Sequence, residues 1–292
     1  MNRFSISDLA RFSGIKPHTI RIWEQRYQAF SPDRTPGNTR NYDGTDLKRL
    51  LNIVSLRDLG YKVAELCGMS DETLGELVSQ LYSSGKSGHL EHFVSQLLYA
   101  GINFDEMSFD KILSHCLLRF GTEDTYTDII YPLLDRAGLM WTAGALHPAQ
   151  EHFISNLIRQ KLITAIDSLP APQTNSPKWL LFLPEDEYHE IGLIFAHFLL
   201  VRRGQKVVYL GSSVPLATLK DAVERIHPDC LLLFLVRRDF PESVIAYLKD
   251  LRGCFPKGKL FVSGNEKQLE QVSPAHNVQK LSSMYNLEEV LE

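Results

Sequence analysis

The sequence predicts a multidomain fold of three parts: a winged helix-turn-helix (α with a small wing), a four-helix bundle, and an α/β domain with a Rossmann-like parallel sheet. A Ser/Gly stretch at 83–88 and a Pro-rich stretch at 170–177 have the composition of linkers. After the second linker, the hydrophobic pattern changes from helical periodicity to strands alternating with helices. We therefore expect domains at 1–75, 76–169 and 178–292.

The N-terminal domain, which we call the head, is basic, and the rest of the chain is acidic. The 292 residues carry a net charge of −4. Residues 1–62 contain eleven Lys or Arg and six Asp or Glu, a balance of +5 that leaves −9 for the remainder. A basic head on an acidic body favours nucleic-acid binding by the head alone.

The composition argues against several classes of protein. Hydrophobic residues make up 44% and charged residues 23%, as in an ordinary globular protein. No apolar stretch approaches the length of a membrane span and the N-terminus has no signal region, so we expect a cytoplasmic protein without membrane contact. The four cysteines form no C-x-x-C pair, which indicates reduced thiols. No Ser/His/Asp constellation is apparent, so we do not expect an enzyme.

The head begins with two helices joined by a tight turn. Ser5 or Ser7 can cap a helix over 5–13, and the turn at 14–17 precedes a second helix over 17–27. In the second helix Ile20 and Trp23 are expected to face inward. This spacing is typical of a helix-turn-helix.

A wing and further helices complete the head. The Pro/Gly/Asn-rich stretch at 31–42 predicts a hairpin-like wing. Thr45 or Asp46 is expected to cap a third helix that ends near Gly60, and 62–82 continue as short helices.

The middle part is predicted to be entirely helical. Apolar residues recur at helical spacing, and turn residues at 101–103, at 121–122 and at Gly144 divide them. A four-helix bundle fits this pattern. The four predicted helices are 89–101, 106–119, 123–140 and 148–168.

The C-terminal part alternates apolar strands with helices, which indicates a parallel sheet with helices on both faces. Gly211-Ser212-Ser213 and Ser263-Gly264-Asn265 are expected in loops that follow strands. The predicted strands are 179–183, 206–210, 230–236 and 259–262, and the predicted helices are 190–203, 216–226 and 242–251.

Three short runs in the head carry a resemblance to a known family: 4–10, 19–27 and 40–42. They are similar to the winged helix-turn-helix of MerR-type transcriptional regulators, over roughly residues 4–75. The resemblance implies that the second helix enters the major groove of a double-stranded DNA operator with an inverted repeat. It also implies self-association, as a dimer or tetramer, and RNA polymerase is a further candidate partner.

The same resemblance places side chains against DNA. Those on the second helix are expected near bases or phosphates, and the arginines would neutralise backbone phosphate. The candidate DNA-binding residues are Thr19, Arg21, Arg26, Tyr27, Arg40 and Tyr42.

Two motifs carry a second resemblance. Trp141 is followed after nine residues by Glu151-His152, and Glu187-x-His189-x-x-Gly192 opens a strand–loop–helix unit. An imidazole is a good donor for cobalt, and a carboxylate two residues earlier can hold the ring tautomer. Together the motifs resemble the adenosylcobalamin-dependent photoreceptor regulators, the CarH/LitR-like group. The fold implied for residues 178–292 is a cobalamin-binding-type domain.

That resemblance assigns a role to each residue of the motifs. His189 would be the lower axial ligand to the cobalt of cobalamin, with Glu187 holding its ring. Gly192 would let the helix start approach the macrocycle. Trp141 would pack against the adenosyl group, while Glu151 and His152 would bond its polar edges. Further cofactor-binding candidates, at the ends of strands, are Ser212, Ser213, Ser263 and Gly264.

The chain departs from that group at four points. Thr142 replaces a histidine that captures cobalt after photolysis, so a light-made bis-histidine adduct is not expected. The third strand, 231–236, lacks a serine or threonine, and Ser263-Gly264 replaces a Gly-Gly pair. Arg237-Arg238 places two cations at a strand end, where they could attract an anionic ligand or a partner.

These departures leave three hypotheses open. The first is a transcriptional regulator, acting as a repressor, whose operator binding is modulated by cobalamin held between the helix bundle and the α/β domain. The second is a MerR-type regulator that keeps the fold but is cobalamin-independent, or that senses another ligand or partner. The third, from another class, is a corrinoid carrier protein in methyl transfer.

Overall fold

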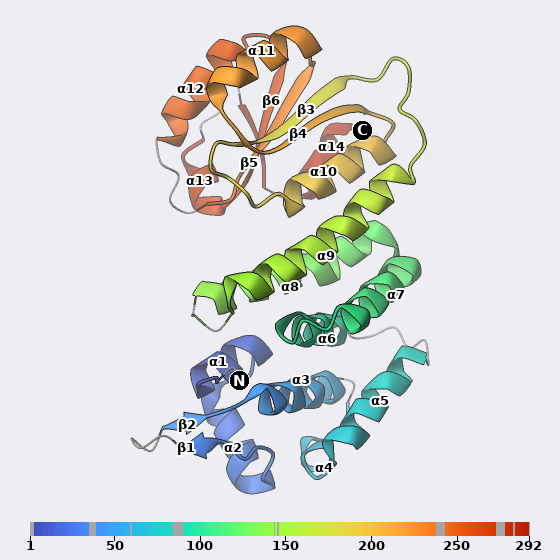
Figure 1. The fold of residues 1–292 in the computed structure, drawn as a ribbon, viewed down its shortest axis with the longest axis vertical. Coiled ribbons are helices and arrows are strands. Elements are labelled where there is room, and N and C mark those ends of the chain that lie inside the picture. Colours follow the sequence, from blue (N-terminus) through green and yellow to red (C-terminus); the bar gives the residue numbers. More distant parts are fainter. Residues whose placement is uncertain are drawn as a thin grey trace. The chain divides into compact units, whose positions relative to one another are not determined.

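The computed structural model describes residues 3–34, 39–58, 60–83, 90–142, 144, 146–237, 243–272, 278–282 and 284–291. It divides into two compact units, Met1–Ile158 and Arg159–Glu292, which we describe separately (Figure 1). No helix among the described residues is long and apolar enough to cross a membrane.

The helix-turn-helix of the head forms where the sequence predicts it. Ser5 caps α1 (Ile6–Ser13) in a capping box with Asp8, and Gly14, at φ 69°, ends the helix. Pro17 begins α2 (Pro17–Tyr27), whose buried residues are Ile20 and Trp23. The inward face expected for α2 is confirmed.

The wing is a short antiparallel pair of strands, β1 (Asp33–Arg34) and β2 (Arg40–Asn41). The part of the predicted wing at 35–38 and the predicted linker at 84–88 lie outside the described residues. Three helices follow: α3 (Gly44–Asp58), α4 (Val63–Cys67) and α5 (Asp71–Ser83).

The expected cap of α3 was wrong. The carboxylate of Asp43 accepts hydrogen bonds from the backbone N–H groups of Thr45 (2.8 Å) and Asp46 (3.0 Å), so Asp43 caps the helix. Thr45 and Asp46 instead donate these backbone bonds from within the first turn of α3.

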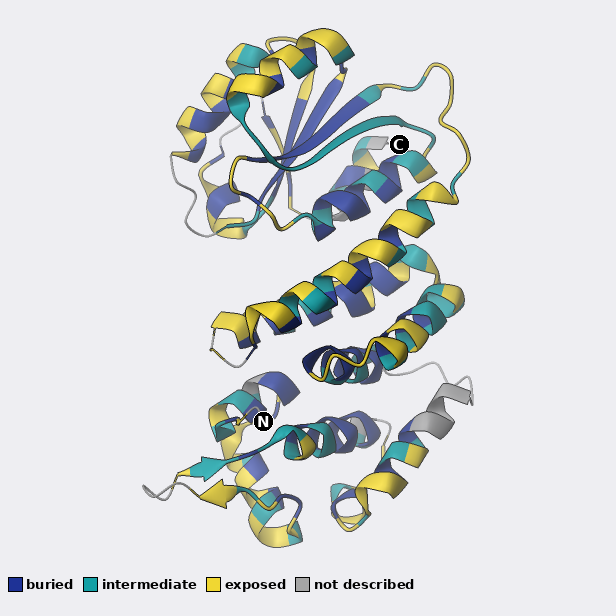
Figure 2. Cartoon of the chain, viewed as in Figure 1, coloured by how far each residue is buried: buried dark blue, intermediate teal, exposed yellow. Residues whose placement is uncertain are grey.

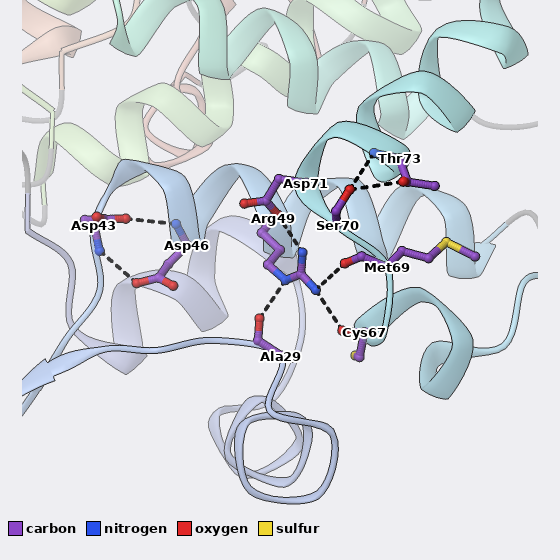
Figure 3. A network of polar contacts seen from close by, with 9 residues as sticks. All are labelled: Ala29, Asp43, Asp46, Arg49, Cys67, Met69, Ser70, Asp71 and Thr73. Atoms are coloured by element: carbon purple, nitrogen blue, oxygen red, sulfur yellow. Dashed lines mark hydrogen bonds and ion pairs between the residues drawn. The ribbon is translucent and has the colours of Figure 1, made fainter.

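Arg49 of α3 joins the other elements of the head (Figure 3). Its guanidinium donates to the carbonyl oxygens of Ala29 (2.7 Å), Cys67 (2.7 Å) and Met69 (2.9 Å), and it pairs with Asp71 at 2.5 Å. These acceptors follow α2, end α4 and begin α5. One half-buried side chain therefore fixes three segments against α3.

The predicted four helices of the middle part are present. Gly121, at φ 81° and ψ 171°, interrupts the helical backbone near the predicted break at 121–122. A β-carbon on Gly101 would lie 2.4 Å from the Ile154 side chain, so two of the helices pack closely at this glycine. The helices are α6 (Leu90–Ile102), α7 (Glu106–Thr125), α8 (Tyr131–Thr142) and α9 (Pro148–Asp167), with a π-helical segment, η1 (Tyr126–Ile130), before α8.

The predicted parallel sheet is confirmed and has five strands in the order β4-β3-β5-β6-β7. The central strands are buried, and helices α11 and α12 cover one face while α10 and α14 cover the other (Figures 1 and 2). The strands are β3 (Lys178–Pro184), β4 (Lys206–Val214), β5 (Cys230–Leu235), β6 (Lys259–Gly264) and β7 (Val278–Leu281). The helices are α10 (Ile191–Arg202), α11 (Leu216–Ile226), α12 (Val244–Cys254), α13 (Glu266–Glu270) and α14 (Met284–Leu291).

Two strands run further than the sequence suggested. Strand β4 continues through Gly211 and Ser213, both at positive φ, because register shifts against β3 accommodate the extra residues. Strand β6 includes Ser263 and Gly264. The two predicted loops after these strands were therefore wrong: their residues lie within β4 and β6, except Asn265, which caps α13.

Candidate functional site

Glu187, in the connection between β3 and α10, is 1% exposed. Its Oε2 accepts hydrogen bonds from the backbone N–H groups of Val236 (3.0 Å) and Arg237 (2.8 Å), and its Oε1 accepts one from the N–H of His189 (3.0 Å). Burial raises the pKa of Glu187, but the hydrogen bonds from the ring and backbone of His189 and from Arg237 together hold that pKa below its ordinary value. Glu187 is therefore a buried carboxylate anion.

The same carboxylate orients the imidazole of His189. Nδ1 of His189 lies 2.6 Å from Oε1 of Glu187, and the histidine side chain is 61% exposed. Because an ionised carboxylate only accepts hydrogen bonds, Nδ1 carries the proton when the ring is neutral. Nε2 is then the nitrogen whose lone pair can coordinate a metal.

The position of this pair in the sheet is where ligands of open α/β folds bind. The chain runs from β3 outward to β4 and then crosses back to β5 on the other side of β3. The strand order therefore reverses between β3 and β5, and ligands of such sheets lie beyond the strand ends at that point. Glu187 follows β3 and bonds the backbone after β5, so it spans this switch point.

Ser213 of β4 also lies against the connection. Its backbone N–H donates to the carbonyl of Glu187 (3.0 Å), and its hydroxyl accepts from the N–H of Asp186 (3.2 Å). Arg237 donates to the carbonyl of Asp186 (3.2 Å), while Arg238 lies outside the described residues. Ser212 is half-buried in β4, and Gly192 is half-buried in the first turn of α10.

Ser263 and Gly264 have structural roles that differ from the expected cofactor contact. Ser263 is buried, and its hydroxyl donates to the carbonyl of Leu281 (2.8 Å), which fixes β7 to β6. A β-carbon on Gly264 would lie 2.2 Å from the carbonyl oxygen of Leu235, and Gly264 has φ 131°. The glycine is thus required by the close approach of β5 and β6.

The second motif lies in the other unit, around the connection of α8 to α9. Trp141 is in the last turn of α8 and is 56% exposed. Glu151 and His152 lie in the first two turns of α9, where Oε2 of the glutamate is 2.9 Å from Nδ1 of the histidine. Only the short segment 143–147 joins the two helices, so all three side chains belong to one end of this helix pair. Thr142 donates its hydroxyl to the carbonyl of Gly138 (2.8 Å).

On the head, α2 presents a polar surface. Arg21 and Arg26 are exposed, and Thr19 and Tyr27 are half-buried. The guanidinium of Arg26 lies 5.5 Å from the centre of the Tyr27 ring, which keeps the cation at the exposed end of the helix. All four therefore have side-chain surface that can meet a DNA groove.

The wing residues differ from this expectation. Tyr42 is fully buried, and its hydroxyl donates to Oε2 of Glu24 (2.7 Å). Nε of Arg40 pairs with Oε1 of Glu24 at 2.8 Å, and this pair raises the pKa of the guanidinium. Tyr42 as a DNA contact is therefore wrong in this structure, because its side chain has no exposed surface.

Glu24 was missed by the sequence interpretation. It lies on α2 among basic residues, and it ties this helix to the wing through both oxygens. A glutamate would repel the phosphates that this helix is expected to meet. Its presence on α2 could therefore have indicated a structural contact within the protein.

No group of three or more His, Cys, Asp or Glu side chains within the described ranges could hold a metal ion. A cobalt that brings its own macrocycle needs only one donor from the protein. The exposed imidazole of His189, held through Nδ1 by a buried anion, fits that requirement.

Comparison with known proteins decides the family. A model of the "MerR HTH family regulatory protein" matches residues 4–73, and a "B12 binding domain" model matches residues 94–165. The HTH-type transcriptional repressor CarA of Myxococcus xanthus is 30% identical over 260 residues, which cover 86% of this chain and 83% of the relative. This chain belongs to that family of HTH-type transcriptional repressors.

A second relative of the family, the HTH-type transcriptional repressor CarH of Myxococcus xanthus, is 29% identical over 259 residues, 87% of this chain and 86% of the relative. The predicted MerR-type head and the predicted link to B12 are both confirmed. In this repressor-family chain the MerR model covers α1 to α4 with the start of α5, and the B12 model covers most of α6 to α9. The chain is a DNA-binding transcriptional regulator with a B12-binding region.

Among solved structures, the monomethylamine corrinoid protein of Methanosarcina barkeri is similar, with a TM-score of 0.55 and 15% identity over 69% of this chain and 98% of that chain. At this identity the likeness shows a shared fold. It gives no support to methyl transfer by this repressor-family member.

Proposed function

We propose that this protein is a transcriptional repressor whose affinity for its operator depends on adenosylcobalamin. The observation that carries the proposal is the Glu187–His189 contact of 2.6 Å at the switch point of the sheet. A buried anion there fixes the tautomer and direction of an exposed imidazole, as a lower cobalt ligand requires.

The side chains around His189 determine how its imidazole can bind a metal. Glu187 keeps the proton on Nδ1 of His189 and supplies negative charge beside the ring. When bound, cobalamin would supply a cobalt centre that the imidazole of His189 could ligate. Ser213 and Arg237 hold the backbone of the connection at Asp186 and Glu187.

We assign the upper axial group of the cofactor to Trp141, Glu151 and His152. An exposed indole offers an apolar face to an adenine ring, and the adjacent carboxylate and imidazole offer an acceptor and a donor. The hydroxyl of Thr142 is engaged with the helix backbone, and a hydroxyl is a weak cobalt donor. No second histidine ligand is expected from this position after illumination.

The DNA contacts proposed for the head are Thr19, Arg21, Arg26 and Tyr27 on α2. We also propose that Arg40 of the wing contacts phosphate, with its guanidinium oriented by the ion pair with Glu24. An inverted-repeat operator would be bound by a dimer or tetramer, and RNA polymerase is a candidate partner. Cobalamin binding would alter how the paired heads are presented.

The test is an absorption spectrum of the purified protein after incubation with adenosylcobalamin in darkness and desalting. A corrinoid spectrum is expected in the wild type, and His189→Ala is expected to lose most of it. His227→Asn, at the exposed end of α11, is the matched control and should retain the cofactor. Colourless wild-type protein after desalting would refute cobalamin binding.

Operator binding completes the test. A duplex selected from a random pool is titrated with and without adenosylcobalamin, in darkness and after illumination. A cobalamin-dependent change in affinity supports the proposal, whereas an unchanged affinity would favour the cobalamin-independent regulator suggested by the altered strand ends.

A further inference from the structure

A second carboxylate, Glu190, directly follows His189. It is the N-terminal flanking residue of α10, and its carbonyl accepts from the N–H of Ile194 (2.9 Å). Its own N–H donates to the carbonyl of Tyr188 (2.9 Å), which closes the backbone tightly around His189. Any shift of Glu190 therefore moves the backbone that carries the imidazole.

The carboxylate of Glu190 is held at both oxygens. Oε1 pairs with Nε of Arg159 at 2.8 Å, and Oε2 accepts from the hydroxyl of Tyr209 at 3.2 Å. The Tyr209 ring stacks on His197 of α10 with centroids 5.3 Å apart, and burial raises the pKa of this tyrosine. The phenol therefore remains a neutral donor to Glu190.

The Arg159–Glu190 ion pair is shielded from water on the side of the glutamate. The Glu190 side chain is 16% exposed and the Arg159 side chain 47% exposed. A pair of this kind contributes modestly to folding because water screens the arginine. Its geometric effect is to hold Glu190, the residue before the first turn of α10, against Arg159 of α9.

Arg159 comes from α9, the helix whose first two turns carry Glu151 and His152. Arg159 lies seven positions after His152, which is about 10 Å along a helix axis. One uninterrupted helix thus carries two of the side chains assigned to the upper axial group, Glu151 and His152, and the arginine that anchors the residue after His189.

We propose that Arg159 is a positioning residue for His189: through Glu190 it sets the direction in which the imidazole meets cobalt. The inference rests on the proposed cobalamin binding. Glu187 anchors the connection to the backbone after β5, and Arg159–Glu190 anchors it to α9 and β4. The histidine lies between the two anchors and depends on both.

The test uses the full-length protein labelled with ¹⁵N-histidine and loaded with cob(II)alamin. The nitrogen hyperfine pattern in its electron paramagnetic resonance spectrum reports whether a protein histidine is bound to cobalt. The dissociation constant for adenosylcobalamin is measured in parallel by absorption titration in darkness. The variants are Arg159→Gln, Arg159→Lys and Glu190→Gln, and the control is Arg225→Gln on the exposed side of α11.

Arg159→Gln and Glu190→Gln are expected to reduce the fraction of histidine-ligated cobalt and to weaken adenosylcobalamin binding about three- to tenfold. Arg159→Lys, which keeps the charge, should restore at least part of the histidine signal, and Arg225→Gln should match the wild type.

Three results would overturn the inference. One is an unchanged histidine signal and dissociation constant in both neutral variants. Another is a lowered thermal stability of the cofactor-free protein with an unchanged histidine signal, which would identify an ordinary stabilising pair. A wild-type protein that binds cobalamin without any histidine signal would refute both this inference and the proposed role of His189, whereas failure of the wild type to bind cobalamin would refute the proposed function itself.

Discussion

Replacement of Arg49 by alanine is expected to unfold the DNA-binding head before the rest of the chain. The Arg49 side chain is 14% exposed, and its guanidinium serves three backbone carbonyls and the Asp71 carboxylate (Figure 3). The three carbonyls belong to segments that are distant in sequence from α3. Their positions relative to α3 therefore depend on this one side chain.

The magnitude follows from the partners. Hydrogen bonds to a charged group contribute about 1.5–3 kcal/mol each, but carbonyls at the rim of the head regain some hydration after the substitution. The half-exposed Asp71 pair adds about 0–1 kcal/mol. We expect a loss of about 3–4 kcal/mol for Arg49→Ala, and about 2 kcal/mol for Arg49→Lys, because a single ammonium cannot reach all four acceptors.

Hydrogen exchange is the suitable assay because a chain of several domains does not unfold in one step. Backbone amides of α2, α3 and α4 should exchange faster in Arg49→Ala by a factor that matches the lost free energy, while amides of β3 and β5 keep their wild-type rates. Lys62→Ala, at an 83% exposed side chain, is the control and should change stability by less than about 0.5 kcal/mol. Wild-type exchange rates throughout the head of Arg49→Ala would show that the network contributes nothing to stability.

Two further predictions concern the other parts of the chain. Gly264→Ala places a β-carbon 2.2 Å from the Leu235 carbonyl oxygen at φ 131°, so we expect the free energy of unfolding of the α/β unit, measured in urea, to fall by about 3 kcal/mol or more. The control Gly253→Ala, in open space on α12, should change stability by at most about 1 kcal/mol. Equal effects of the two substitutions would contradict the steric argument. Burial lowers the pKa of His92 in α6 from 6.5 to about 4. Below pH 6.5 the unfolded chain therefore binds a proton that the folded chain does not, and stability falls as the pH drops towards 4, by on the order of 3 kcal/mol in total. His92→Phe should flatten this part of the stability curve, measured as urea midpoints between pH 4 and 7, and an unchanged slope would rule out His92 as its source.

Local signals explain what the sequence predicted well. Gly14 and Pro17 mark the boundary between α1 and α2, because glycine permits the left-handed backbone that ends α1 and proline fixes φ at the start of α2. The apolar runs of β3 and β5 are buried on both faces, so they read clearly as central parallel strands. The contact between Glu187 and His189 spans two residues and was also accessible from the motif.

Signals from distant partners explain what the sequence missed. Tyr42 is polar in sequence, but its hydroxyl can be buried because Glu24, eighteen residues away, accepts a hydrogen bond from it. Strand β4 lies at the sheet edge, where intermediate burial and a β-bulge hide its continuation past Leu210. The short β7 is recognised only by its pairing with β6.

The candidate site depends both on a local sequence motif and on contacts with residues distant in sequence. Its motif occupies only six residues, yet Glu187 bonds to backbone 49 and 50 residues away, and Glu190 bonds to Arg159 and Tyr209. The direction of the imidazole is therefore set by the assembly of β3, β4, β5 and α9 and not by the loop alone. It follows that a substitution within the sheet, such as Gly264→Ala, should weaken cobalamin retention to the extent that it disturbs this assembly. A variant supports a specific role for a residue in ligand binding only when it alters cobalt ligation while the stability of the cofactor-free protein is preserved.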